Sequence, residues 1–171
     1  MIHAVTVQNQ HLYAAQLDQM FRMRHAYYVL GHQWAGVSSR EGREIDEFDD
    51  GEVVYLLALD ILGDVAASLR LNPGDQDTLL RKFESVYCAE PLTRDAASFD
   101  LSRWIARPED RRGEAARWRT NAQRELMLGL LEFCGRRGVR RLTMLAEHRL
   151  AERIASYGWP LRYLGEAQPY E

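Results

Sequence analysis

Two apolar segments that lie close together in the chain constrain its fold most. Residues 52–60 (EVVYLLALD) and 65–71 (VAASLRL) are mostly aliphatic, and a short turn at Gly63 and Asp64 separates them. Such a pattern is typical of a buried β-hairpin. A sheet is therefore expected, and the helices of the chain must pack on it to bury their apolar faces.

Hydrophobic periodicity places further elements around this hairpin. Helices are predicted at 12–30, 78–88, 114–134 and 147–157. Strands are predicted at 3–7, 99–106, 139–145 and 160–164, with a long acidic loop at 32–51. A helix between two strands predicts a parallel, right-handed crossover. The order indicates an α/β fold, a single domain over residues 1–171 with a mixed twisted sheet flanked by helices.

Composition excludes several classes of protein. With 171 residues, 46% hydrophobic and a net charge of −3, the chain fits one globular domain and not a disordered segment. No apolar run approaches the roughly 20 residues that span a bilayer, and the N-terminus lacks a secretory signal. A cytoplasmic protein without membrane insertion is expected. Cys88 and Cys134 have no metal-like spacing and are expected to be free thiols.

Charge is segregated along the chain. Residues 1–80 carry 5 basic and 12 acidic residues, whereas residues 101–141 carry 11 arginines and 5 acidic residues. The acidic balance of the whole chain argues against nucleic-acid binding. The basic segment predicts a patch for an acidic carrier protein or a coenzyme pyrophosphate, and a solvated helix start is the alternative. Its arginines include Arg111, Arg112, Arg117 and Arg119.

Familiar catalytic motifs are missing from the sequence. It contains no GxxxxGK[ST] phosphate loop, no GxGxxG, no GxSxG and no HExxH, and its five histidines form no i, i+4 pair. Neither a zinc site nor a serine hydrolase is expected, and no metal is predicted.

Arg24 shares the apolar face of the first predicted helix with Leu17, Phe21 and Tyr28. A guanidinium on a buried face needs carboxylate partners, so this residue indicates either a core ion pair, an arginine that reaches the edge, or a binding site. Further along, the segment EIDEFDD places Asp46 and Asp49 three residues apart. In a turn, two such carboxylates can converge on one cation such as an amine or a sulfonium, and a solvated acidic loop is the alternative.

The strand at 99–106 carries Asp100, Ser102 and Arg103. Plain alternation puts Asp100 and Ser102 on one face and Arg103 on the other. A bulge here would re-aim these side chains and free a backbone N–H as an oxyanion donor, and the alternative is a set of polar residues on an edge strand. Arg70 in the hairpin and Trp34 in the loop are unremarkable when each is taken alone.

Taken together and in this order, these residues resemble the acyl-homoserine-lactone synthases, the autoinducer synthases of bacterial quorum sensing. The resemblance is carried by Arg24, Tyr28 and Trp34, then the EIDxFD motif, Arg70 and the DLSR strand. It implies a fold like that of the Gcn5-related N-acetyltransferases. The sheet would splay between 99–106 and 139–145 to admit an acyl-pantetheine arm.

The resemblance also implies a reaction. The α-amine of S-adenosyl-methionine attacks an acyl thioester, and its carboxylate then closes the lactone and expels methylthioadenosine. Both molecules are substrates, and no cofactor is expected. Asp100 would be the general base, with Ser102 beside it, and Thr143 and Met144 would border the acyl tunnel. The S-adenosyl-methionine site would be lined by Arg24, Tyr28, Trp34, Asp46, Asp49, Arg70 and Arg103.

The chain departs from the family pattern at three points. Tyr28 stands where the family usually has Phe, and Asp100 where it usually has Glu. The domain is also expected to be short at its C-terminus. The acyl donor is a carrier protein in most members of the family and an acyl-CoA in one rhizobial branch. Two segments of this chain resemble that branch, HLYAAQLDQMFRMRHAYYV and VVYLLALD. Two alternatives remain at this point, an N-acyl amino acid synthase of the same fold and a degenerate member without catalysis.

Overall fold

The computed structural model describes residues 1–34, 36–37, 39–107 and 114–168, with the backbone alone for 114–121. Its helices are α1 (Ala14–Arg24), α2 (Leu79–Lys82), α3 (Glu84–Tyr87), α4 (Glu114–Arg137) and α5 (His148–Ser156). The 3-10 turn η1 (Gln10–Tyr13) precedes α1, and the π-helical segment η2 (His25–Gly31) continues it. Its strands are β1 (Ile2–Val5), β2 (Ser39–Arg40), β3 (Arg43–Glu44), β4 (Val54–Leu59), β5 (Val65–Pro73), β6 (Ser98–Ala106) and β7 (Arg141–Met144).

The five-stranded sheet has the order β1-β4-β5-β6-β7. Its first four strands pair antiparallel, whereas β6 and β7 run parallel. The predicted hairpin is β4–β5, and α4 provides the predicted crossover between β6 and β7. The prediction of a mixed sheet flanked by helices is therefore confirmed.

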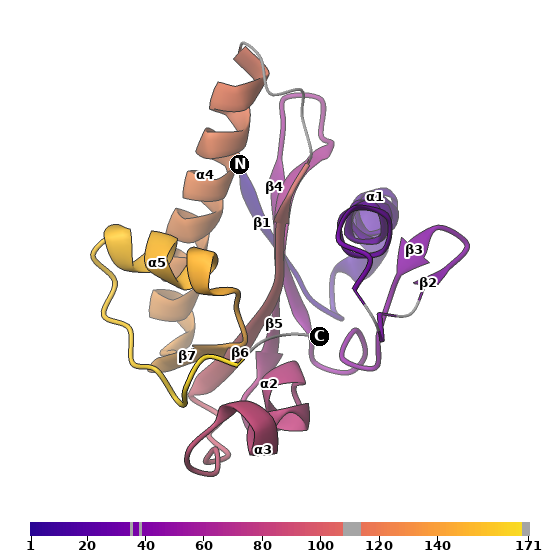
Figure 1. Ribbon diagram of the computed structural model, residues 1–171. Coiled ribbons are helices and arrows are strands. Elements are labelled where there is room, and N and C mark those ends of the chain that lie inside the picture. The colour runs from indigo at the N-terminus through magenta and orange to yellow at the C-terminus, as the bar shows by residue number, and fades with distance from the viewer. Residues whose placement is uncertain (35, 38, 108–113, 169–171) are drawn as a thin grey trace.

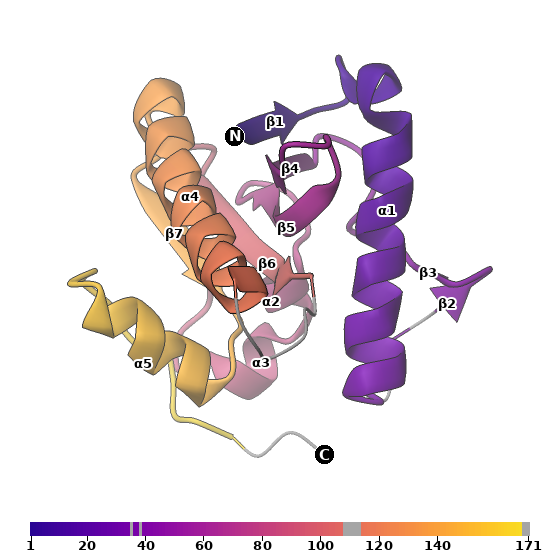
Figure 2. The same cartoon turned by 90° about the horizontal axis from the view of Figure 1, so that it is seen from above.

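Helices cover both faces of this sheet (Figures 1 and 2). On one face, α4 packs on an apolar cluster that includes Leu56, Leu69, Leu101, Leu126 and Leu130. On the other, α1 packs through Met20 on Val5, Tyr55 and Leu57. Alternation along β4 sends Leu56 to one cluster and its two neighbours to the other, as expected for a strand buried on both faces.

Three local predictions needed correction. Residues 160–164 do not form a strand; they run past the end of α3, where Ala89 N–H donates to the Leu164 carbonyl at 2.7 Å. The 32–51 segment is not all loop, because β2 and β3 form a small hairpin within it. The helix predicted at 78–88 is divided into α2 and α3 at Phe83, which has φ −108° and ψ 15° and thus leaves helical geometry.

Strand β6 carries a bulge at its centre. Arg70 pairs with Ser102 and Ser68 with Ile105, so β6 has one extra residue between these pairs. Arg103 within the bulge has φ +53°, in the left-handed region. The bulge changes which face the following residues occupy, and Leu101 and Trp104 both reach the cluster under α4.

The β6–β7 pairing is short. It joins Ser98–Leu101 to Arg141–Met144, whereas β6 continues to Ala106. Beyond Leu101 the two strands are no longer paired in the described structure, which agrees with a sheet that splays at this point.

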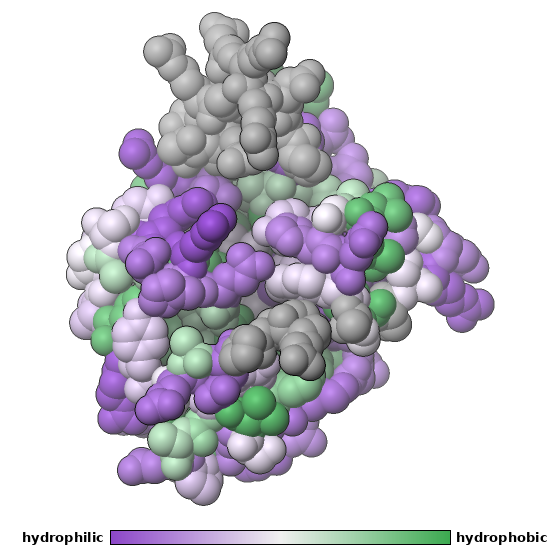
Figure 3. Space-filling model, viewed as in Figure 1, coloured by the Kyte–Doolittle hydropathy of each residue, from purple (hydrophilic) through white to green (hydrophobic). Residues whose placement is uncertain are grey.

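The thiols and the character of the helices complete the description of the fold. Cys88 and Cys134 are free. Within the described ranges, no helix has the length and apolar character to cross a bilayer, and no group of His, Cys, Asp and Glu side chains is arranged to hold a metal ion. The face seen in Figure 3 mixes hydrophilic and hydrophobic residues, with its apolar residues in small separate patches.

Candidate active site

A buried guanidinium begins the site on the α1 side of the sheet. Arg24 at the end of α1 has no exposed surface. Its Nη1 and Nη2 donate to the two carboxylate oxygens of Asp49, both at 2.7 Å, and its Nε donates to Glu44. The paired fork on Asp49 is the strong bidentate geometry of arginine and carboxylate. The ion-pair interpretation of Arg24 is thus confirmed, and whether it binds substrate stays a prediction.

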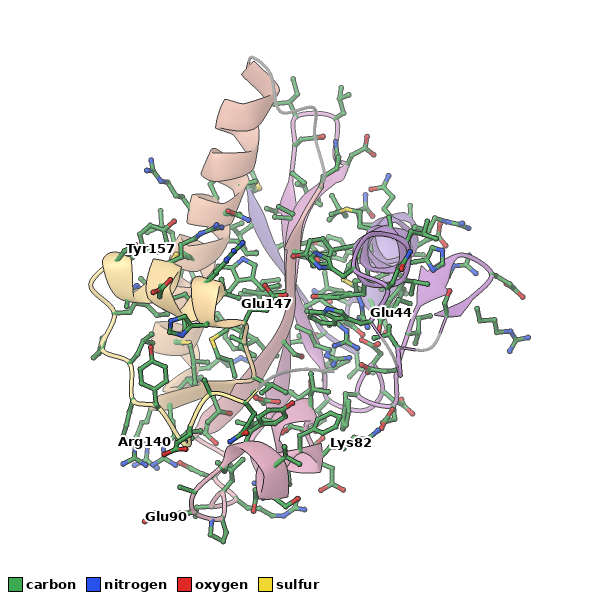
Figure 4. The ribbon with its side chains drawn as sticks, viewed as in Figure 1. Glu44, Lys82, Glu90, Arg140, Glu147 and Tyr157 are labelled. Carbon is green, nitrogen blue, oxygen red and sulfur yellow. The ribbon has the colours of Figure 1, made fainter. Side chains whose placement is uncertain are left out.

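Glu44 is the member of the site that the sequence interpretation missed. It ends β3, lies on the α1 side in Figure 4, and is completely buried. It bridges two arginines, because it accepts from Arg24 Nε and from Arg103 Nη2, the latter at 2.7 Å. Its position two residues before Asp46 was the available signal, since alternate residues of an extended segment share a face.

Asp46 and Asp49 converge through a tight turn, as their spacing predicts. The Asp49 amide donates to the Asp46 carbonyl at 3.1 Å, and the Asp46 amide donates to Asp49 Oδ2 at 2.9 Å. Tyr55 on β4 adds a hydrogen bond from its hydroxyl to Asp49 Oδ1 at 2.9 Å. The solvated-loop alternative is wrong for these two side chains, which are 10% and 1% exposed.

Arg70 on β5 joins the turn to β6. Its Nη2 donates to Asp46 Oδ2 at 3.2 Å, its Nη1 lies 3.0 Å from Asp49 Oδ1, and its Nε donates to Ser102 Oγ at 2.9 Å. Strand pairing explains the last contact, because Arg70 and Ser102 are opposite each other in the β5–β6 register. Ser102 is therefore held by Arg70 in this structure.

Arg103 reaches the same cluster only because of the bulge. It donates through Nη2 to Asp46 Oδ2 and to Glu44, each at 2.7 Å. The expectation from plain alternation, which put Arg103 on the face opposite Ser102, is wrong; the extra residue turns both side chains to the α1 side. The predicted alternative of a bulge is confirmed.

An aromatic wall borders Arg103. Its guanidinium lies 5.0 Å from the centre of the Tyr28 ring, and the Trp34 ring is 4.9 Å from that of Tyr28. The π-helical segment η2 carries Tyr28, and the Trp34 amide donates to the Tyr28 carbonyl at 3.1 Å. An arginine over an aromatic face is a favourable cation–π arrangement.

The arginines of the network lower the pKa of two of its carboxylates, Asp49 and Glu44. Burial alone raises the pKa of Asp49, but its hydrogen bonds and ion pairs with Arg24 and Arg70 outweigh burial and lower that pKa. Burial likewise opposes ionisation of Glu44, whose pKa is nevertheless lowered by Arg103 and Arg24. Burial raises the pKa of Tyr28, which keeps its phenol neutral. The cluster thus holds its charges in balance.

Asp100 lies outside this ion-pair cluster. It is 1% exposed, and its oxygens accept from the Leu80 amide of α2 and from Thr143 Oγ1 of β7, each at 3.1 Å. Burial raises its pKa against the opposing effect of these hydrogen bonds and one from Thr78. A raised pKa brings a carboxylate closer to the range useful for proton transfer near neutral pH.

The other predicted site residues are those of the acyl pocket and of the basic segment. Thr143 and Met144 face Asp100 and Leu101 in the β6–β7 register, at the point where the pairing ends. Met144 also packs against the apolar cluster under α4. Arg111 and Arg112 lie outside the described residues, and Arg117 and Arg119 fall where only the backbone of α4 is described.

Chemically, the site has two parts on one face of β5 and β6. The first is a charge-balanced network whose most exposed carboxylate is Asp46. The second is Asp100, opposite Asn72 in the register and two residues from Ser102. Such a site suits a small molecule that carries both charges, held beside a carboxylate able to accept a proton.

A comparison with models of known families identifies the family of the chain. The model of the autoinducer synthase family matches residues 8–171. The chain belongs to the autoinducer synthase family. The resemblance drawn from the motifs is therefore confirmed.

Curated relatives of this family are synthases of acyl-homoserine lactones. The chain is 32% identical over 166 residues to the isovaleryl-homoserine lactone synthase of Bradyrhizobium diazoefficiens, covering 96% of this chain and 72% of the relative. It is 28% identical to the acyl-homoserine-lactone synthase of Agrobacterium fabrum over 155 residues, covering 90% of this chain and 73% of the relative.

Solved structures agree. The CoA-dependent acyl-homoserine lactone synthase MesI matches with a TM-score of 0.84 and 30% identity, covering 99% of this chain and 82% of MesI. BjaI, another CoA-dependent synthase, solved with SAM and isopentyl-CoA, matches with a TM-score of 0.82 and 28% identity over 99% of this chain and 77% of BjaI. A Trypanosoma brucei acetyltransferase, 11% identical with a TM-score of 0.54 over 99% of each chain, confirms the acetyltransferase-like fold.

Proposed function

We propose that this chain is an acyl-homoserine-lactone synthase that transfers the acyl group of an acyl-CoA to S-adenosyl-methionine in the cytoplasm. The observation that carries the proposal is the complete network of Arg24, Arg70 and Arg103 with Glu44, Asp46 and Asp49, in a chain of the autoinducer synthase family. The S-adenosyl-methionine site and the residues proposed to border the acyl chain belong to one acyltransferase-like domain over residues 1–171.

The network is proposed to hold S-adenosyl-methionine by its charges. Asp46, the carboxylate with the most exposure, attracts the cationic end of the substrate, and Tyr28 and Trp34 offer it an aromatic face. Arg70 and Arg103 offer guanidinium groups to the substrate carboxylate. Because the protein charges already balance one another, the site binds a molecule of mixed charge without a large residual field.

Asp100 is proposed to be the general base. The substrate amine attacks the thioester carbonyl, a C–N bond forms, the C–S bond breaks and the CoA thiolate leaves. The amine loses its proton to Asp100, whose raised pKa favours acceptance. Both oxygens of Asp100 already accept hydrogen bonds, and its side chain is one methylene shorter than that of the Glu usual in the family. A bridging water is therefore expected to carry the proton from the amine to Asp100.

Ring closure needs no protein nucleophile. The substrate carboxylate attacks its own γ-carbon, an O–C bond forms, and the C–S bond to the sulfonium breaks so that methylthioadenosine leaves as a neutral thioether. The protein has to hold the carboxylate in line with the leaving sulfur, which is a matter of orientation. Thr143 and Met144, where β6 and β7 separate, are proposed to border the acyl chain.

An acyl-CoA is proposed as the donor because the relatives MesI and BjaI are CoA-dependent and the Bradyrhizobium relative makes an isovaleryl product. The basic segment is the proposed contact for the phosphates of the donor; its arginines are Arg111, Arg112, Arg117 and Arg119. Branched acyl-CoAs are therefore the first donors to test.

The test incubates the protein with S-adenosyl-methionine and a panel of straight, branched and aromatic acyl-CoAs, with matched acyl-carrier proteins in parallel. Mass spectrometry should detect an acyl-homoserine lactone and an equal amount of methylthioadenosine with a CoA donor. Lactone from the carrier proteins alone would overturn the donor assignment. An acylated amino acid without methylthioadenosine would indicate the N-acyl amino acid synthase, and no product from any donor would overturn catalysis.

A matched pair of variants tests the site within one loop. Asp46→Asn removes a charge that contacts Arg70 and Arg103, whereas Asp50→Asn changes an exposed carboxylate four residues later. Lactone formation should fall by about 100-fold or more in the first, since a buried charged hydrogen bond is lost. It should stay within about twofold of wild type in the second. Equal activity in both variants would reject Asp46 as a site residue.

A further inference from the structure

One buried polar atom beside the network has no hydrogen-bond partner among the residues that the structure describes. The Asn72 side chain, 4% exposed on β5, donates through Nδ2 to the Phe48 carbonyl at 2.8 Å. Its Oδ1 accepts no hydrogen bond from any part of the chain that the structure describes. The orientation of the amide is determined by Phe48, because a carbonyl accepts only from the NH₂ end.

Asn72 lies between the two parts of the site. It is two residues from Arg70 along β5, so both side chains are on the same face, and it stands opposite Asp100 in the β5–β6 register. Opposite residues of antiparallel strands have Cβ atoms roughly 4.5–5.5 Å apart. Phe48, which holds its amide nitrogen, belongs to the turn that joins Asp46 to Asp49.

A buried amide oxygen without a donor is unfavourable and calls for a ligand that supplies one. The required group is a hydrogen-bond donor that reaches the space between Asp46 and Asp100. A carboxylate or an ether of a substrate cannot provide it, because neither has a proton to donate. S-adenosyl-methionine has donors in its ribose hydroxyls, its adenine amino group and its α-amine, and of these the α-amine is the one that has to lie beside the proposed base Asp100, which is opposite Asn72. An amine can donate to an amide and to a carboxylate at the same time.

We infer that Asn72 Oδ1 binds the α-amine of the amino-acid substrate and holds it beside Asp100. This assignment rests on the proposed function, since it needs an amine substrate in this site. Asn72 thereby fixes the position of the attacking nitrogen, while its Nδ2 keeps the Asp46–Asp49 turn in place through the Phe48 carbonyl. One amide connects the carboxylate turn with the general base.

The experiment compares two ligands by calorimetry: S-adenosyl-methionine and its deamino analogue, which keeps the carboxylate, the sulfonium and the adenosine. In the wild type, loss of the amine should raise Kd by about tenfold or more, as expected for a hydrogen bond to a charged group. In Asn72→Leu and in Asn72→Ala, the Kd of S-adenosyl-methionine should rise about tenfold, whereas that of the analogue should change by less than about threefold. A role limited to holding the turn would weaken both ligands equally.

Ser68→Ala is the matched control. Ser68 is also on β5, is 1% exposed and has a hydroxyl without a partner in the described structure, but it stands opposite Ile105 and away from Asp100. Its variant should bind both ligands as the wild type does. Thermal unfolding checks that each variant is folded, and the wild-type comparison of the two ligands needs no variant at all.

The outcomes separate this inference from the proposed function. Equal loss of affinity for both ligands in the Asn72 variants, or equal affinity of the wild type for both ligands, would overturn the role of Asn72. If the wild type makes lactone and one of these two binding results is observed, only the role of Asn72 is rejected and the proposed function stands. A wild type that binds no S-adenosyl-methionine and makes no lactone overturns both.

Discussion

Both faces of the sheet bury an apolar cluster, but only the face under α1 also buries a network of charged side chains. Under α4, residues such as Leu126 and Leu130 are fully buried among other apolar side chains. Under α1, Arg24, Arg70 and Glu44 are just as completely buried, and each is surrounded by opposite charge. An apolar interior tolerates imperfect packing at moderate cost, whereas a buried ion network requires every partner.

This difference separates stability from function. Apolar residues of similar volume often stabilise a fold as well as a buried ion pair or better. A network of three arginines and three carboxylates is therefore an inefficient way to fill space, and its presence on one face marks that face as the functional one.

The largest effect should come from removing an arginine of the network. Arg24→Ala removes the bidentate partner of the buried Asp49 and one of the two arginines that contact Glu44, so the free energy of unfolding should fall by about 3–5 kcal/mol. Urea denaturation measures this change. Arg22→Ala, on the same helix with its side chain 52% exposed, is the control and should change it by less than about 0.5 kcal/mol. A small loss in the Arg24 variant would contradict the comparison of the two faces.

A core truncation on the opposite face should lower stability without changing the site. Leu130→Ala is expected to cost about 2–5 kcal/mol in the same urea experiment, because it leaves a cavity under α4. Its affinity for S-adenosyl-methionine, measured where the protein is folded, should stay within about twofold of wild type. Leu128→Ala, on the exposed side of α4 at 65%, should be nearly neutral in both measurements. Lost affinity in Leu130→Ala would show that the faces are coupled.

Acid should weaken the α1 face selectively. The pKa values of Asp49 and Glu44 are lowered in the folded protein, so these groups add stability above their ordinary pKa values of 3.8 and 4.5 and lose it as pH falls toward the lowered values. Urea midpoints between pH 7 and pH 3 should thus fall at the acid end. The decline should be shallower in Glu44→Gln, and a profile parallel to wild type would contradict the buried pairing.

The contribution of Asp100 to stability should depend on pH in the opposite direction to the contributions of Asp49 and Glu44, although it lies on the same face of the sheet. Its pKa is raised by burial, so its contribution to stability is complete below its ordinary pKa of 3.8 and is lost as pH rises through the raised value. Relative to wild type, Asp100→Asn should therefore gain stability between pH 4 and pH 7. The control Asp77→Asn changes a side chain that is 81% exposed and should not reproduce this trend.

The smallest effect concerns the aromatic wall. Tyr28→Phe keeps the ring whose centre lies 5.0 Å from the Arg103 guanidinium, so Kd for S-adenosyl-methionine should change by less than about twofold. Tyr28→Leu removes the ring and should raise Kd by about tenfold, in line with a desolvated cation–π contact. Similar affinities in the two variants would show that the ring face is dispensable.

Most of the secondary structure could be predicted from local pattern. The hairpin β4–β5, the crossover helix α4 and the helical region around Arg24 follow from apolar periodicity and turn residues. The error at 160–164 has a simple reason: a short apolar stretch is compatible with a strand but does not determine whether a partner strand is available. In the structure this segment lies against the residues after α3.

The site was predicted in part. The motif order identified Arg24, Asp46, Asp49, Arg70 and Arg103, and the structure brings all five together. Glu44 was missed because its one local signal, a position two residues before Asp46, does not distinguish a buried carboxylate from the solvated ones of an acidic loop. Its role follows from two arginines that approach it from α1 and β6, far apart in the sequence.

By itself, the sequence determined the fold class, the family and the identities of most charged residues in the site. Only the tertiary structure decided how their charges are matched, which depends on distances that no local pattern encodes. The bulge in β6 turns Arg103 toward Glu44, and the β5–β6 register sets Asn72 opposite Asp100. The sequence pattern of apolar and polar residues reflects the periodicity of single helices and strands. The pairing of charges depends instead on the register between neighbouring elements.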